Sequence, residues 1–203
     1  MNKKIFAQLL GYSQNNLDKV TQPYILETFG VEVARCDTLE QYTDAINDAS
    51  LDRYFSKYWE NDIKKWKYSG LALVDEVNSL RPRAVLDVGC GYNEFKGKID
   101  NLIGIDPYND KADIQVSTLE YRTTQKFDVM LCLGSVNFGS RDKIISEVGR
   151  CVDLLEDGGT MFFRVNPGVQ HNKPEAKWIE FFAWNVPFII ELSEIFNLKV
   201  LDI

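Results

Sequence analysis

A carboxylate and a glycine-rich turn stand where a buried strand is expected to end. Residues 85–94 read VLDVGCGYNE, so an apolar run passes into Asp87 and then into Gly89, Cys90 and Gly91. Glycine lets the backbone turn sharply and lets a ligand press against bare main chain. The pattern predicts a ligand-binding loop with a negative charge at its base.

A second acid, Asp106, ends the apolar stretch LIGID and lies 19 positions after Asp87. That separation is close to the offset of about 20 residues at which an acid binds ribose hydroxyls in nucleotide-binding folds. Two acids at successive strand ends therefore predict a ligand that contains a nucleoside.

The charge of this loop distinguishes between nucleoside ligands. A dinucleotide site uses the pattern G-x-G-x-x-G and places a pyrophosphate at a helix N-terminus. In this chain the third glycine position is Glu94, and a carboxylate there would repel a pyrophosphate. A sulfonium nucleoside without phosphates fits better, because the ammonium group of its amino-acid part can pair with Asp87 directly or through water.

The elements that position these residues are expected in the second part of the chain. Short apolar runs alternate with helical stretches there, and several runs are continuous, as in strands covered on both faces. The alternation predicts an α/β fold with a doubly wound, mostly parallel sheet, whose ligands bind at the carboxyl ends of the strands. We expect strands at 84–89, 101–106, 112–117, 127–134, 159–165 and 198–203, and helices at 141–155 and 175–196.

The first part of the chain, residues 1–65, is predicted to be a mostly helical cap on the substrate side. A capping-box pattern, Asp37 followed by Glu40, predicts a helix over 38–48. Apolar residues at three-, four- and seven-residue spacings then predict one long helix over 51–80, with a bend at Gly70. The remaining expectations are short helices at 3–10 and 14–20 and a strand-like segment at 24–36, broken at Gly30.

Composition excludes several classes of protein. The chain has 203 residues, a net charge of −7 and a pI of about 4.8, and no apolar run approaches the ~20 residues of a membrane helix. The negative charge disfavours binding to bulk nucleic acid. The four cysteines form no C-x-x-C pair, which argues against a metal site or a disulfide framework and favours a reducing, cytoplasmic location.

Four segments in order carry a resemblance to a known family. VLDVGCGYNE, LIGIDPYND, KFDVMLCLGSVNF and LLEDGGTMFFRV together resemble the class I S-adenosylmethionine-dependent methyltransferases, over residues 66–203. The resemblance implies a Rossmann-like methyltransferase fold and S-adenosyl-L-methionine as cofactor. It also implies that residues 66–203 form the cofactor-binding domain, and that the preceding cap selects the methyl acceptor.

The resemblance assigns roles to residues that match the family's motifs. It implies a cofactor loop at the glycine turn, a ribose contact at the second acid, an adenine contact after the third strand and a methionine contact after the fourth. The resemblance places Asp87, Gly89, Cys90 and Gly91 in the cofactor loop, Asp106 at the ribose with Pro107 beside the adenine, Ser117, Thr118 and Leu119 after the third strand, and Leu133, Gly134 and Ser135 after the fourth. Tyr68, from the preceding helix, could cover the cofactor or simply pack in the core.

The chain departs from the family's pattern in several places. Asn93 stands where the family's loop has a third glycine, although asparagine tolerates a left-handed backbone. No aspartate lies at 117–119, so the adenine contact there falls to backbone or a hydroxyl group. A seventh, antiparallel strand is not evident. Either the sheet is smaller, or segment 24–36 fills an edge, or the chain is a fragment.

Candidate catalytic residues follow the fifth expected strand. His171, the single histidine, and Asn166 lie in RVNPGVQHNKPE, where a base or an acceptor-orienting group would border the acceptor. The Asp/Asn-Pro-Pro-aromatic motif of base amino-methylases and the Pro-Cys pair of cytosine methylases are both absent. The aromatic residues of segment 178–184 could line an acceptor pocket or belong to the core.

The sequence is compatible with three functions. The leading one is methyl transfer from S-adenosylmethionine to an unidentified small-molecule or protein acceptor. The alternative is a non-catalytic methyltransferase-like module for binding or assembly. A third, a nucleotide-sugar or NAD-binding Rossmann protein, is opposed by Glu94.

Overall fold

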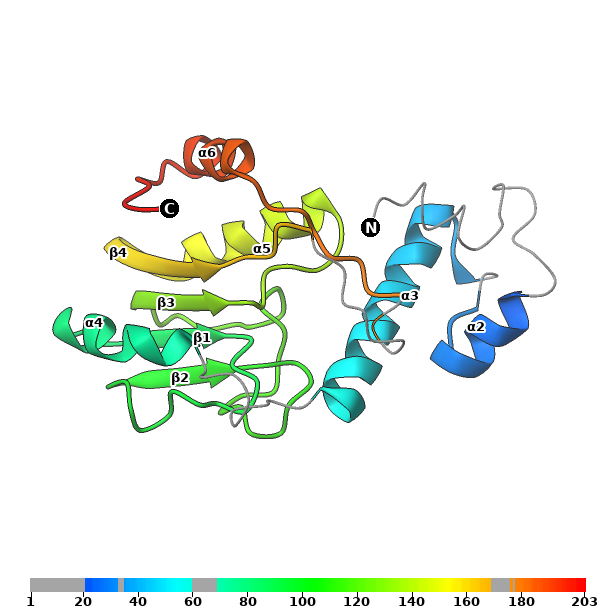
Figure 1. Ribbon diagram of the computed structural model, residues 1–203, viewed down its shortest axis with the longest axis horizontal. Coiled ribbons are helices and arrows are strands. Elements are labelled where there is room, and N and C mark those ends of the chain that lie inside the picture. The colour runs from blue at the N-terminus through cyan, green and yellow to red at the C-terminus, as the bar shows by residue number, and fades with distance from the viewer. Residues whose placement is uncertain (1–20, 33–34, 60–68, 169–175, 177) are drawn as a thin grey trace.

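Four parallel strands form the sheet of the computed structural model, which describes residues 21–32, 35–59, 69–168, 176 and 178–203 (Figure 1). The predicted helices 3–10 and 14–20, as well as Tyr68 and His171, lie outside the described residues. The strands are β1 (Val85–Val88), β2 (Leu102–Ile105), β3 (Phe127–Leu133) and β4 (Leu155–Arg164), in the spatial order β2-β1-β3-β4.

The strand order reverses beside β1. β2 pairs with one edge of β1 and β3 with the other, so Asp87 is registered with Gly104 on one side and with Leu131 on the other. All four residues of β1 are buried, which fits a central strand covered on both faces. The reversal between β1 and β3 creates the crevice in which parallel α/β sheets bind ligands.

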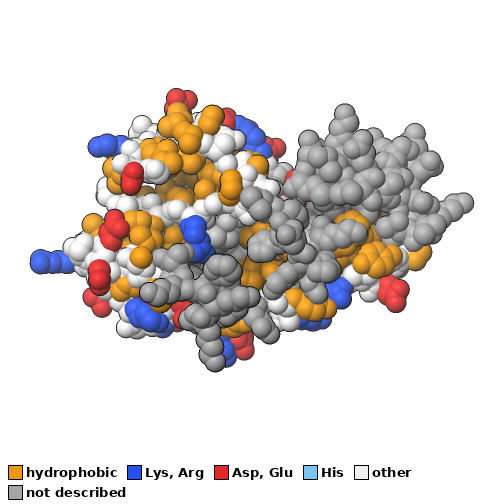
Figure 2. Space-filling view, in the orientation of Figure 1, with side chains coloured by type: hydrophobic (Ala, Val, Ile, Leu, Met, Phe, Trp, Pro, Cys, Tyr) orange, Lys and Arg blue, Asp and Glu red, His pale blue; other side chains and the backbone are white. Residues whose placement is uncertain are grey.

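Helices cover both faces of the sheet, as the predicted α/β fold requires. On one face, α5 (Arg141–Leu154) and α6 (Val186–Ile195) contribute Ile144, Val148 and Leu192 to a core shared with β1 and β3. On the other face, α4 (Val74–Ser79) contributes Val77 to a second core. Hydrophobic side chains also gather on the surface over α6, where Ile190 and Ile195 are exposed (Figure 2).

Two helices of the N-terminal part lie beside the carboxyl ends of the strands (Figure 1). They are α2 (Thr21–Phe29) and α3 (Leu39–Arg53), and α3 continues into a π-helical turn, Tyr54–Tyr58. The Asn47 side chain accepts a hydrogen bond from Glu180 N–H at 2.7 Å, and Asp48 pairs with Lys143 of α5 at 2.7 Å. These contacts fix α3 against the part of the chain that contains the sheet. None of the helices described has the length and apolarity needed to cross a membrane.

Several predictions for the N-terminal part are wrong. Segment 24–36 is not strand-like, because α2 occupies Thr21–Phe29 and buries Ile25 against Tyr42 and Ile46 of α3. It therefore cannot fill a sheet edge.

The long helix predicted over 51–80 is also wrong. α3 ends at Arg53, the π-helical turn follows, and Trp59 has an extended backbone. A 3₁₀ turn, Ser69–Leu73, then leads into α4. The helix predicted over 38–48 is confirmed and extends further, with Thr38 as its N-cap in place of Asp37.

Three predictions in the sheet half need correction. Segment 112–117 forms only one bridge, Ile114 to Ile105, because the Asp113 carboxylate takes the Gly104 N–H at 2.8 Å and so competes with a ladder. Segment 198–203 forms no strand, since no described strand lies beside it as a ladder partner. The helix predicted over 175–196 begins only at Val186, where the Asn185 side chain caps it.

Candidate functional site

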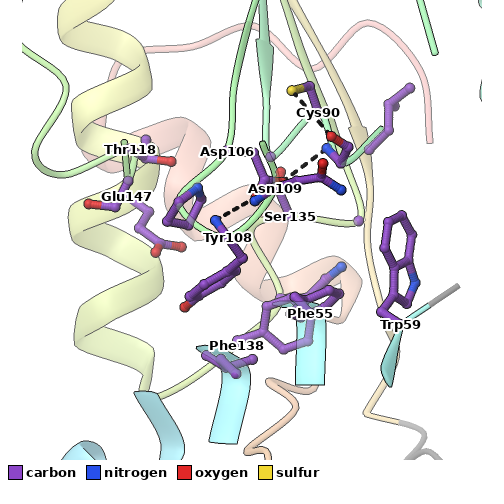
Figure 3. A pocket seen from close by; sticks show the side chains of 18 of the residues that line it. Phe55, Trp59, Cys90, Asp106, Tyr108, Asn109, Thr118, Ser135, Phe138 and Glu147 are labelled. Carbon is purple, nitrogen blue, oxygen red and sulfur yellow. Dashed lines mark hydrogen bonds between the residues drawn. The ribbon is translucent and has the colours of Figure 1, made fainter. Parts of the chain in front are cut away.

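A cleft of about 1040 Å³ opens at the carboxyl ends of the strands (Figure 3). It brings together most of the residues singled out in the sequence, from four separate strand ends. Those residues are Gly89, Cys90, Gly91, Asp106, Pro107, Ser117, Thr118, Leu119, Leu133, Gly134, Ser135 and Asn166. Asp87 lies behind the wall of the cleft, and His171 is outside the described residues.

The glycine loop adopts the backbone that its sequence predicts. Gly89 and Gly91 have φ angles of 66° and 54°, in the region that favours glycine. A Cβ at Gly89 would lie 2.3 Å from the Ser135 Cβ, so the end of β3 packs directly on the loop. The N–H groups of Gly89 and Cys90 both donate to the Ile105 carbonyl, at 2.8 and 3.0 Å, which ties the loop to β2.

Asn93 replaces the loop's third glycine in the way that was predicted. Its φ is 58°, and its side-chain amide donates to the Lys111 carbonyl at 3.1 Å. Gly104 of β2 makes room for this arrangement, because a Cβ there would lie 2.7 Å from Asn93 Oδ1 and 2.8 Å from Cys90 Sγ. Gly104 was not predicted as a site residue, because its only signal in the sequence is a glycine inside an apolar strand.

Asp87 is a buried carboxyl group whose hydrogen bonding is incomplete. The residue is 3% exposed, and its Oδ2 finds no hydrogen-bond partner among the described residues. Burial, and then the nearby charge of Asp106, raise the pKa of Asp87 to about 7. Buried polar atoms in native proteins almost always have a partner. The unsatisfied oxygen therefore fits a cationic or N–H donor that the described part of the chain does not supply.

Asp106 organises the loops on either side of it. Its Oδ2 accepts the Gly91 N–H at 3.0 Å, and its Oδ1 accepts the N–H groups of Tyr108 and Asn109 at 2.8 and 2.9 Å. A carboxylate has about four acceptor positions. The three backbone bonds leave a position for a ligand hydroxyl on Oδ2, while they fix the orientation of the group.

An aromatic wall closes the cleft from the side of the cap, and the sequence analysis did not identify it. The Phe55 ring, on the π-helical turn, stacks on Tyr108 with a centroid distance of 5.8 Å and an angle of 10°. Phe55 also meets Phe138 edge to face at 5.5 Å. Burial raises the pKa of the Tyr108 hydroxyl well above its usual value. The spacing of these aromatic residues in the sequence does not distinguish residues of a cleft wall from residues of a core.

Trp59 closes the opposite end of the cleft, next to the glycine loop (Figure 3). Its ring stacks on Tyr92 at 5.1 Å, and the Tyr92 hydroxyl donates to the Trp59 carbonyl at 3.1 Å. A Cβ on Gly91 would lie 2.9 Å from this ring. Trp59 and the glycine loop are therefore in direct contact.

Glu147 of α5 is a further cleft residue that the sequence did not reveal, because it occurs in an ordinary amphipathic helix. Burial raises the pKa of its carboxyl group to about 7, although Lys143 partly opposes this and Asp48 adds to it. Within the described ranges, no group of three or more His, Cys, Asp or Glu side chains is placed to hold a metal ion.

The aromatic residues of segment 178–184 divide between wall and core. Phe181 lines the cleft, whereas Trp178 packs on Phe29 of the cap. Phe182 and Trp184 pack on Phe188 of α6. Of the two alternatives left open for this segment, a pocket wall holds for Phe181 and core packing for the other three aromatic residues.

No family model and no curated protein sequence matches this chain. Solved structures do match. An N-methyltransferase, NodS from Bradyrhizobium japonicum WM9 with S-adenosyl-L-homocysteine, has a TM-score of 0.51 at 18% identity over 71% of this chain and 83% of its own. The 1,6-didemethyltoxoflavin-N1-methyltransferase of Burkholderia thailandensis has a TM-score of 0.58 at 15% identity, over 76% and 79%. A DhpI complex with S-adenosylhomocysteine has 0.52 at 13%, over 73% and 84%.

At identities this low the likeness concerns the fold. The chain has the Rossmann-like fold of the class I S-adenosylmethionine-dependent methyltransferases, and the resemblance seen in its sequence is confirmed at that level. The open parallel sheet, the glycine loop after β1 and the acid after β2 are the features of this chain that correspond to that fold.

Proposed function

We propose that the chain binds S-adenosyl-L-methionine in the cleft and transfers its methyl group to a small-molecule or protein acceptor. The observation that carries the proposal is the unsatisfied Asp87 oxygen beneath a glycine loop at the strand-order reversal. An ammonium group at the base of that loop would satisfy the oxygen, directly or through water.

The cofactor-binding roles follow the geometry of the cleft. Asp106 would hold the ribose hydroxyls, because its Oδ2 retains an acceptor position. The glycine loop, with Gly134 and Ser135 opposite, would hold the amino-acid part beside Asp87. Pro107, Thr118 and Leu119 would contact the adenine. The shape of the cleft supports this arrangement, since all of these residues except Asp87 line it.

S-adenosylmethionine, when bound, supplies a methyl group on a positively charged sulfur. The chain's own residues then have to align an acceptor with that group and exclude water, which are large contributions to methyl transfer. The aromatic wall formed by Phe55, Tyr108 and Phe138 supports the exclusion of water. Asn166 would orient the acceptor, because it lies on the cleft at the end of β4. His171 stays a prediction.

The acceptor proposal draws on the cap and on the similar structures. Asp48, Phe55 and Trp59, all in the proposed cap of residues 1–65, line the cleft, which supports a cap that selects the acceptor. The two similar proteins from Bradyrhizobium and Burkholderia are named as N-methyltransferases, and the second was solved with 1,6-didemethyltoxoflavin bound. A small nitrogen-containing acceptor is consistent with both.

Cofactor binding tests the proposal. In calorimetric titration we expect S-adenosylhomocysteine to bind the wild-type chain with micromolar affinity. Asp106→Asn should weaken binding about 10-fold, because one charge-assisted hydrogen bond to the ribose is lost. Asp110→Asn is the matched control, since Asp110 is an exposed acid in the same loop, and it should leave affinity unchanged.

The other outcomes separate the competing functions. No binding of S-adenosylmethionine or its product would support a non-catalytic module, and binding of NADH in their place would support a dinucleotide protein. Transfer of a labelled methyl group into a cell extract, with products fractionated by size, would then identify the acceptor class.

A further inference from the structure

The order of groups in the proposed cofactor determines where its purine would lie, so this inference rests on the proposed function. The ribose connects the base to the amino-acid chain. If the glycine loop holds the amino-acid part and Asp106 the ribose, the base must lie beyond Asp106, away from the glycine loop. Figure 3 shows that end of the cleft beside α5, with Thr118 and Glu147 on one side and Cys90 and Trp59 on the other.

The segment after the bridge residue Ile114 offers little side-chain chemistry for a purine. Residues 117–119 contain no acid. The Ser117 hydroxyl already donates to Glu120 Oε2 at 2.6 Å. Thr118 remains as the one side chain of this segment on the cleft with an uncommitted polar group in the described structure. Backbone groups and the Thr118 hydroxyl are thus what this segment itself offers, and a carboxyl group would have to come from a second element.

Glu147 is placed to make that contact. It lines the cleft from α5, and no hydrogen bond to its carboxyl group occurs within the part of the chain that the structure describes. Lys143, one turn earlier, donates to Asp48 Oδ1 at 2.7 Å and is thus held toward the cap. Figure 3 shows the Glu147 side chain on the same side of the cleft as Tyr108, which follows Pro107.

We propose that Glu147 recognises the amino edge of the adenine and so replaces the acid that segment 117–119 lacks. One carboxyl oxygen would accept a hydrogen bond from the 6-amino group, which is a donor. The other, when protonated, would donate to the ring nitrogen N1, which is an acceptor. A neutral carboxylic acid carries one donor and one acceptor side by side, and so does this edge of adenine.

The protonation state of Glu147 agrees with this pairing. Burial raises its pKa to about 7, against the opposing charge of Lys143 and with the support of Asp48. The Tyr108 hydroxyl, whose own pKa is raised well above its usual value, stays neutral beside it. The neutral acid is therefore well populated at pH 6, and its donor is lost as the pH rises above 7.

The test pairs a change in the protein with a change in the ligand. Calorimetric titration would compare S-adenosylhomocysteine with its purine analogue that lacks the 6-amino group. We expect the wild-type chain to bind the analogue roughly 10-fold more weakly, as for the loss of one or two hydrogen bonds. Glu147→Ala should bind S-adenosylhomocysteine about as weakly as wild type binds the analogue, and should no longer distinguish the two ligands.

A conservative variant separates recognition from a structural role. Glu147→Gln keeps a donor and an acceptor but does not titrate, so it should bind S-adenosylhomocysteine within about 3-fold of wild type at pH 6. At pH 8.5 it should bind more tightly than wild type, which has lost its donor. Asp87 titrates in both proteins, so its effect cancels in this ratio. Asp142→Asn, an exposed acid at the start of α5, is the control and should follow wild type at both pH values.

Two failures can be told apart. If wild type binds neither ligand, the proposed function is overturned, and the inference about Glu147 with it. If wild type binds S-adenosylhomocysteine but Glu147→Ala still rejects the analogue 10-fold, the inference alone is overturned, and the cofactor site stands without Glu147.

Discussion

At the scale of single residues, two carboxyl groups at neighbouring strand ends have opposite surroundings. Asp106 accepts three backbone N–H bonds, whereas Asp87 Oδ2 has no partner among the described residues. Backbone N–H groups thus fix the orientation of the Asp106 carboxylate, whereas Asp87 keeps one oxygen that a donor of a ligand could reach. A cationic ligand would therefore gain most from Asp87, because it would complete the hydrogen bonding of a desolvated group.

The raised pKa of Asp87 predicts a pH-dependent stability. The pKa is about 7 in the folded chain and 3.8 for an unperturbed group, so the folded state binds more protons between these values. Stability of the ligand-free protein should therefore fall as the pH rises from 4 to 7. In Asp87→Asn the contribution of Asp87 to this loss should disappear, and the variant should gain on the order of 2–4 kcal/mol over wild type between pH 4 and pH 8.

Urea unfolding at pH 4.5, 6 and 8 measures this difference. Glu147 contributes in the same direction, but it is present in both proteins and cancels between them. Parallel pH profiles for wild type and Asp87→Asn would show that Asp87 is not desolvated as the structure indicates.

The residues that could be predicted are those with a strong local signal. Glycines that follow a strand and an asparagine in a left-handed backbone depend on short-range sterics, so Gly89, Gly91 and Asn93 were identified correctly. Gly104 and Glu147 depend on neighbours that are distant in sequence, Cys90 and the loops around Pro107, and no local pattern reveals them.

At the scale of secondary structure, the turn after α3 joins the cap to the sheet. Phe55 on the π-helical turn contacts Tyr108 and Phe138, which belong to loops after β2 and β3. π-Helical turns are rare and frequently occur at functional sites. The single 51–80 helix was not found because the turn ends at Tyr58 and Trp59 has an extended backbone, which the apolar spacing does not reveal.

Removal of the Phe55 ring should loosen the cap more than the sheet. We expect Phe55→Ala to lower the free energy of unfolding by about 1–3 kcal/mol, because a half-buried ring and its four aromatic contacts are lost. Amide hydrogen exchange should increase across α3 well before it increases in β1 or β3. Lys57→Ala, an exposed position on the same turn, should show neither effect. Equal increases in α3 and in β1 would contradict a separate loosening of the cap.

The strands with continuous apolar runs were predicted well, because the apolar run within each strand is itself the signal. β1, β2 and β3 fall inside the expected ranges, whereas segment 112–117 pairs with β2 only through one bridge and segment 198–203 forms no strand. A strand needs a ladder partner, and that partner is a property of the tertiary fold. In segment 112–117 the Asp113 side chain, and not a backbone carbonyl, accepts the Gly104 N–H, so the pairing with β2 stays short.

At the scale of the whole molecule, the parallel order of the sheet followed from alternation along the chain, and the fold was predicted for that reason. The arrangement of the cap did not follow, because its helices pack through Ile25, Tyr42 and Ile46 in a small separate core. Such a core contributes little stability on its own. The cleft is lined from the cap by Leu51, Tyr54 and Phe55 and from the other side by the loops after the strands, so a ligand in the cleft would contact both parts of the chain and stabilise both.

Ligand binding should accordingly raise the melting temperature. At 100 times its dissociation constant, a ligand that binds only the folded state adds about 2.7 kcal/mol. For a chain of this length that corresponds to roughly 5–10 °C. Differential scanning fluorimetry with S-adenosylhomocysteine should show this shift, and NADH at the same concentration should show none. The reverse result would favour a dinucleotide-binding protein.

The contact between Trp59 and the glycine loop has an optical consequence. The Trp59 indole lies against Gly91 and stacks on Tyr92, so it borders the part of the cleft above the glycine loop. Whatever fills that space replaces water at the edge of the chromophore and alters its emission. Trp59 emission should therefore report occupancy of the site without a dye or a label. Substitution of Trp59 by phenylalanine should abolish this change in emission.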